Sequence, residues 1–231
     1  MNFAIDTICK YNYCGYKTRK EPFKEIQIIY FDKYFEKEYD GAKSTEETVM
    51  RKILVLGHVD HGKTMFIRAL NSVLYNRFGI GDEAGLIQEQ VVTAKKSFTF
   101  VVDGESYQYM DYPGFADYID MFEAGEEKFD AALMVCAATD GPMSQTRKLA
   151  RMAKEKGIDK LVLFLSKVDI VDDDELLELV GFGAVEVLVE EGYDESMPMI
   201  AGSADRAMMN PTGEHGDKIV EVIKAMAGLF D

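Results

Sequence analysis

A glycine-rich loop of eight residues, 57–64, constrains the fold of this 231-residue chain more than any other segment. It follows four apolar residues, Ile53 to Leu56, which predict a short buried strand. After the loop, apolar residues recur at helical spacing, at Ile67, Leu70, Leu74 and Phe78. The loop reads GHVDHGKT and matches the pattern G-x-x-x-x-G-K-[ST], which joins a strand to a helix. We therefore expect a strand, a loop and a helix at this point.

Each part of the loop is suited to holding a phosphate group. Glycines at both ends let the backbone curl, so that successive N–H groups converge on an anion at the positive end of the following helix. Lys63 would neutralise the β and γ oxygens of a nucleotide, and the Thr64 hydroxyl would coordinate Mg²⁺. The nucleotide-binding residues predicted here are Gly57, His58, Val59, Asp60, His61, Gly62, Lys63, Thr64 and Met65. A glycine-rich turn without a ligand is the alternative, and the position between a strand and a helix argues against it.

Short apolar runs alternate with helical patterns over the rest of the chain, which is typical of an α/β fold. Further buried strands are predicted at 131–136, 161–165 and 198–201. Two short strands, 98–102 and 107–110, flank Asp103-Gly104, a strong signal for a two-residue hairpin. The pattern predicts a mainly parallel sheet with helices on both faces and one antiparallel hairpin strand.

Composition excludes several classes of protein. The formal charge of −15 has the wrong sign for a protein that grips nucleic acid through its phosphates. The longest uncharged apolar stretch, Ala131 to Ala138, is too short to span a membrane. Three cysteines do not form a disulfide framework, and Asp6 and Lys10 interrupt any secretory core, so we expect a cytoplasmic protein. Residues 1–49 are predicted to be an extension of unknown role, with a β-forming or docking segment at 26–35, and residues 50–231 a separate domain.

Four further segments, together with the loop, resemble the G domain of translational GTPases such as elongation factor Tu. Residues 111–118 read DYPGFADY, close to the family's D-x-P-G-H-A-D-Y, and residues 137–143 read AATDGPM. The sequence SKVD at 166–169 lies where the family has the guanine-reading N-K-x-D, and GSA at 202–204 corresponds to the loop beside the base. The resemblance covers about residues 51 to 231 and implies a P-loop GTPase fold that binds GTP and GDP with Mg²⁺.

The resemblance assigns roles to individual residues. Asp111 would hold Mg²⁺ through a water molecule, and the Gly114 N–H would reach a γ-phosphate oxygen. Asp169 is suited to guanine on chemical grounds, because a carboxylate accepts from both N1–H and the 2-amino group, whereas adenine offers a lone pair at N1. The remaining base-binding residues would be Ser166, Lys167, Ser203 and Ala204.

Three positions depart from the family pattern. Phe115 stands where the family has the histidine that orients the attacking water, and its ring has no polar atom for that purpose. Ser166 replaces an asparagine and is too short for the same amide contacts to the loop and the base, so we expect weaker nucleotide binding. Thr93, in the sequence QVVT, aligns with the Mg²⁺-binding threonine of the first switch segment. The predicted catalytic set is therefore Lys63, Thr93, Gly114 and Phe115, and the metal set is Thr64, Thr93 and Asp111.

The acidic run from Asp172 to Glu178 allows two interpretations. Acidic residues favour the positive end of a helix, and leucines at 176, 177 and 179 with Val180 would supply its buried face. In the family the corresponding helix, 172–191 here, also contacts the nucleotide-exchange factor and the ribosome, so a retained partner surface is the alternative.

We expect a GTP-binding protein that hydrolyses GTP slowly and is related to translation. The alternative is a non-hydrolysing, nucleotide-bound module that regulates the translation machinery, and Phe115 favours it. An ATP-dependent enzyme is disfavoured because Asp169 would repel adenine. The family clamps aminoacyl-tRNA with two β-barrel domains that this sequence does not include, so no independent tRNA binding is expected.

Overall fold

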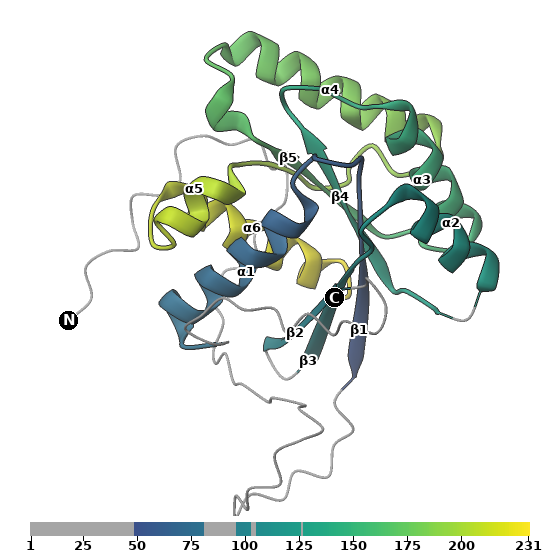
Figure 1. The fold of residues 1–231 in the computed structure, drawn as a ribbon, viewed down its shortest axis with the longest axis horizontal. Coiled ribbons are helices and arrows are strands. Elements are labelled where there is room, and N and C mark those ends of the chain that lie inside the picture. The colour runs from purple at the N-terminus through teal and green to yellow at the C-terminus, as the bar shows by residue number, and fades with distance from the viewer. Residues whose placement is uncertain (1–48, 81–95, 103–104, 126) are drawn as a thin grey trace, which may run out of the picture.

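A computed structural model of the chain describes residues 49–80, 96–102, 105–125 and 127–231. Its six strands form one sheet in the order β2-β3-β1-β4-β5-β6 (Figure 1). They span Met50–Leu56 (β1), Lys96–Val102 (β2), Glu105–Asp111 (β3), Ala131–Ala137 (β4), Leu161–Ser166 (β5) and Met199–Ala201 (β6). Strand β2 is antiparallel to β3, and the other neighbouring pairs are parallel. The predicted α/β fold with one antiparallel hairpin strand is confirmed.

Helices cover both faces of this sheet. They span Lys63–Phe78 (α1), Phe115–Ala124 (α2), Ser144–Glu155 (α3), Asp174–Glu190 (α4), Ala204–Met209 (α5) and Glu214–Gly228 (α6), and a 3₁₀ turn spans Val168–Ile170 (η1). Helices α1, α5 and α6 lie on one face and α2, α3 and α4 on the other (Figure 1). Successive side chains of β1 point to opposite faces: Ile53 and Val55 pack with α1 and α6, while Leu54 and Leu56 pack with α2 and α3. Such two-sided burial explains the uninterrupted apolar runs of the strands.

The parallel arrangement brings the carboxyl ends of β1, β3, β5 and β6 to one edge of the sheet. The segments that follow these strands carry the four motifs predicted to bind a nucleotide. The order of strands reverses beside β1, where open α/β sheets usually bind their ligands. The fold therefore assembles motifs that lie more than a hundred residues apart in the sequence.

Helix α4 differs from the prediction in the residues that it buries. Asp173 caps its start by accepting from the Leu176 N–H at 3.0 Å, as an acidic start suggests. Leu177 and Val180 pack toward the core, but Leu176 is 44% exposed and Leu179 is 69% exposed, so the prediction that both are buried is wrong. Because a helix turns 100° per residue, Leu176 and Leu179 lie on its outer side together with Phe182, which is 60% exposed.

Some predictions fall on residues outside the described ranges. These are the extension up to residue 48 with its segment 26–35, Thr93, and the hairpin turn Asp103-Gly104. The strands on either side of that turn pair in register from Lys96 with Asp111 to Val102 with Glu105, which agrees with a two-residue connection. Within the described ranges, none of the helices combines the length and the apolar character needed to cross a bilayer.

Candidate functional site

The loop after β1 adopts backbone conformations that its sequence makes possible. Gly57 has φ of +145° and Gly62 has φ of +96°, values that side chains with a Cβ rarely tolerate. A Cβ on Gly57 would lie 2.3 Å from the carbonyl oxygen of Val135 in β4, so only glycine fits there. Asp60 is also left-handed, with φ of 65°. These turns direct the chain into the N-terminus of α1, where unpaired N–H groups and the helix dipole favour an anion.

Lys63, the first residue of α1, folds its side chain back over the loop. Its Nζ donates to the carbonyl oxygens of Gly57 at 3.0 Å and His58 at 3.2 Å. Burial lowers the pKa of Lys63, and the nearby carboxylates of Asp111 and Asp60 oppose that effect. An ammonium group has three N–H donors, so one hydrogen can still point to a phosphate oxygen.

Thr64 and Asp111 face each other across the end of the sheet. The Thr64 hydroxyl donates to Asp111 Oδ2 at 2.7 Å, and Asp111 is almost fully buried at the end of β3. The Tyr118 hydroxyl donates to the Val55 carbonyl at 2.5 Å and lies 3.3 Å from Asp111 Oδ1. Burial raises the pKa of Tyr118 well above its ordinary value, and the charge of Asp111 adds to this, so the hydroxyl stays protonated. Tyr118 in α2 thus bonds to β1 and places its hydroxyl beside the carboxylate.

The other end of the site is built from the residues after β5 and β6. Lys167 adopts a left-handed conformation with φ of 58°, uncommon for a residue other than glycine, and it starts the turn η1 that contains Asp169. Burial raises the pKa of the Asp169 carboxyl, but hydrogen bonds from Ser203 and Arg206 outweigh it and leave that pKa below its ordinary value. The carboxylate is therefore charged at neutral pH and held from α5.

Ser166 contacts the nucleotide loop through its hydroxyl group. It is the last residue of β5 and is 2% exposed. Its hydroxyl donates to the His61 carbonyl in the loop at 2.6 Å and lies 3.3 Å from the Cys136 carbonyl. Ser166 thus contacts the loop through its hydroxyl, although it has no amide group and reaches less far toward a base than asparagine.

Phe115 and Gly114 begin α2. The Phe115 ring packs against the core between α2 and α3, and the Lys148 Nζ lies 5.2 Å from its centroid. A Cβ on Gly114 would lie 2.8 Å from Asp117 Oδ2. The ring of Phe115 thus packs on the core of the sheet face that α2, α3 and α4 cover.

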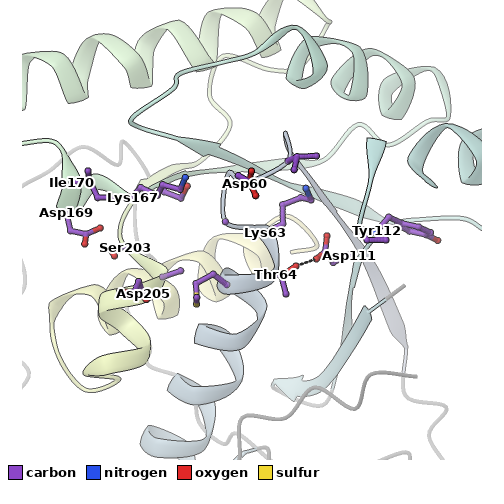
Figure 2. A pocket seen from close by; sticks show the side chains of 16 residues that line it. Asp60, Lys63, Thr64, Asp111, Tyr112, Lys167, Asp169, Ile170, Ser203 and Asp205 are labelled. Atoms are coloured by element: carbon purple, nitrogen blue, oxygen red, sulfur yellow. Dashed lines mark hydrogen bonds between the residues drawn. The ribbon is translucent and has the colours of Figure 1, made fainter. Parts of the chain in front are cut away.

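One pocket of about 470 Å³ brings most of the predicted residues together. Figure 2 shows Lys167, Asp169 and Ser203 at one end and Thr64 with Asp111 at the other, with Asp60 and Lys63 between them. The predicted residues that line it are Val59, Asp60, Gly62, Lys63, Thr64, Met65, Asp111, Ser166, Lys167, Asp169, Ser203 and Ala204. Outside its lining lie Gly57, His58, His61, Gly114 and Phe115.

Four lining residues were not predicted, namely Tyr112, Pro113, Ile170 and Asp205. Each is adjacent in the sequence to a predicted residue, so its position beside a motif could have identified it as a lining residue. Two supporting residues were also missed: Tyr118, whose hydroxyl lies beside Asp111, and Arg206, which donates to Asp169. Among the described residues, no three His, Cys, Asp or Glu side chains cluster as they would in a protein-only metal site.

Comparison with protein-family models matches residues 48–229 to the Elongation factor Tu GTP binding domain. The match covers the whole sheet, the loop after β1 and both ends of the pocket. It agrees with the mainly parallel sheet and with the motifs that line the pocket. The chain therefore belongs to the family of elongation factor Tu GTP-binding domains.

Proposed function

We propose that residues 50–231 are a G domain that binds GTP and GDP together with Mg²⁺, hydrolyses GTP slowly and acts in translation in the cytoplasm. The observation that carries this proposal is the single pocket shared by the phosphate loop, the Thr64 and Asp111 pair and the Asp169 carboxylate. Its volume of about 470 Å³ lies in the ordinary range for small-molecule sites. Membership of a GTP-binding family supports the same nucleotide.

Asp169 supports guanine as the base. A charged carboxylate accepts from N1–H and the 2-amino group of guanine, and it faces a lone pair at N1 of adenine. Lys167 and Ala204 line the same pocket, and we propose that the aliphatic part of Lys167 contacts the face of the base and that the Ala204 N–H donates to the guanine carbonyl.

The oxygen atoms of Thr64 and Asp111 suit Mg²⁺, which prefers hard oxygen ligands. Thr64 donates a hydrogen bond from its hydroxyl to Asp111, so the lone pairs of the Thr64 hydroxyl oxygen can coordinate a cation. Bound Mg²⁺ would neutralise charge on the phosphates, as in other phosphate-loop proteins. Thr93 is proposed as a further ligand. Because the described residues hold no larger acidic cluster, the phosphates and water would complete the coordination.

Slow hydrolysis is proposed because Phe115 cannot position a water molecule. Its ring has no hydrogen-bond acceptor and packs on the core beside α3. Lys63 and backbone donors, including the Gly114 N–H, would still stabilise charge on the transferred phosphoryl group. The site thus supports binding more completely than it supports catalysis.

A non-hydrolysing interaction module is the second candidate, and the outer side of α4 favours it. Leu176, Leu179 and Phe182 form an exposed apolar stripe there, with Ile170 63% exposed at the preceding turn. Acidic residues border the stripe, so a partner with basic residues around an apolar contact would fit it. We propose the ribosome or a nucleotide-exchange factor as such a partner.

Competition titration with GDP and ADP tests the proposed nucleotide. We expect GDP to bind at least about a hundredfold tighter, because ADP would leave Asp169 facing a lone pair. Asp169→Asn should lose this preference and gain affinity for xanthosine diphosphate, whose 2-oxo group accepts where guanine donates. Asp205→Asn removes a carboxylate from the same pocket and should keep the preference. Equal affinities of the parent for GDP and ADP would refute the proposal.

A further inference from the structure

Arg206 makes a contact that the nucleotide motifs do not account for. Its Nε donates to Asp169 Oδ2 at 3.1 Å, and the two residues are 37 positions apart in the sequence. The Arg206 side chain is 58% exposed, whereas that of Asp169 is 17% exposed. Arg206 does not line the pocket that Asp169 lines, so the guanidinium approaches the carboxylate from outside. The pocket side of the carboxylate stays open to a base.

The start of α5 connects Arg206 to Asp169 by a second route. Ser203, the N-cap of α5, accepts from the Arg206 N–H at 3.1 Å and is also hydrogen-bonded to the Asp169 carboxylate. The backbone and the side chain of Arg206 thus act on the same carboxylate. Carboxylate oxygens each accept two or more hydrogen bonds, so the bonds from Ser203 and Arg206 do not exclude the two donors of guanine.

We infer that Arg206 is a positioning residue for base selection: it fixes the orientation of the Asp169 carboxylate, so that both oxygens face the donors of guanine. The inference rests on the proposed guanine site and adds a residue to it. The Arg206 side chain is largely exposed, so the ion pair adds little to folding stability. Its effect is on base selection: it aligns the Asp169 carboxylate, and this alignment matters most when the carboxylate must accept two hydrogen bonds from the base at once.

The ratio of GDP affinity to IDP affinity measures that alignment, because IDP has the same phosphates and N1–H but lacks the 2-amino group. We expect Arg206→Ala to lower this ratio about two- to fivefold, the range that corresponds to an exposed ion pair. Arg206→Lys keeps the charge but not the planar donor, so it should restore part of the ratio.

Arg151→Ala is the matched control. Arg151 also uses its Nε in an ion pair, with Glu191, and is 59% exposed, but it lies on α3 outside the pocket lining. It should leave the ratio unchanged, and thermal melts of all variants would show that they fold. A parent that prefers GDP over ADP, with an unchanged ratio in Arg206→Ala, would overturn the inference alone. Tighter GDP binding by Arg206→Ala would also overturn it, since Arg206 would then compete with the base. A parent without preference for GDP would refute the guanine site and this inference together.

Discussion

Removing the Ser166 hydroxyl should loosen the nucleotide loop. The hydroxyl donates to the His61 carbonyl at 2.6 Å in a position that is 2% exposed. Ser166→Ala would take this donor away from a buried carbonyl, which costs about 1–3 kcal/mol. We expect a loss of about that size in the free energy of unfolding, measured by urea titration. We also expect a severalfold weaker affinity for GDP, because the loop N–H groups would no longer be held in place.

Two variants control this experiment. Ser166→Asn restores a donor at the same place and should bind GDP at least as tightly as the parent. Ser106 is also buried, but it pairs with Met50 at the end of β1 that lies away from the loop. Ser106→Ala should therefore leave GDP affinity unchanged. If Ser166→Ala matched the parent in both stability and affinity, the reasoning that this hydroxyl holds the loop would be refuted.

Two further predictions concern the loop. Gly57→Ala should lower the free energy of unfolding by at least about 2 kcal/mol, because the new Cβ would meet the Val135 carbonyl at 2.3 Å. Gly79 is also left-handed but has open space around it, so Gly79→Ala should cost only about 1–2 kcal/mol. Equal losses for the two variants in urea titrations would contradict the steric argument. Burial, with a contribution from His58, lowers the pKa of His61 to about 4, against about 6.5 in an unfolded chain. As the pH falls, the unfolded state therefore binds a proton before the folded state does. The free energy of unfolding should decrease between pH 6.5 and 4 by up to about 3 kcal/mol. His61→Gln should remove that part of the pH dependence, and an unchanged slope would show that His61 does not cause it.

The strands and the loop could be predicted because their signals are local. A continuous apolar run such as Ala131 to Cys136 identifies a strand buried on both faces, and β4 spans that run with one residue more. The loop pattern fixes glycines at the points where the backbone turns, as the φ values of Gly57 and Gly62 show. Motif positions also placed Asp111 and Asp169 in one pocket, since Asp111 ends one strand of the sheet and Asp169 follows another that runs parallel to it.

The contacts that support the site depend on residues far apart in the chain. Ser166 and the His61 carbonyl are 105 positions apart, and no pattern around residue 166 indicates the hydroxyl contact between them. The packing of the Phe115 ring on the core of this sheet face is likewise not indicated by any pattern around residue 115. Leucine spacing in α4 likewise could not identify which side of the helix the sheet covers, so Leu176 and Leu179 were wrongly predicted to be buried.

Single-turnover GTP hydrolysis at saturating protein tests most directly whether this G domain binds better than it catalyses. Phe115→His should raise the rate by up to about 10²-fold, because an imidazole can accept a hydrogen bond from the attacking water. An imidazole is also more polar than a phenyl ring, so it packs less strongly on the apolar core and is freer to turn toward the water. Phe115→Ala opens the same space without an acceptor and should bring no gain. GDP affinity should be the same in all three proteins, because Phe115 lies outside the pocket lining. A parent that hydrolyses GTP as fast as Phe115→His would contradict the account, since another residue would then position the water.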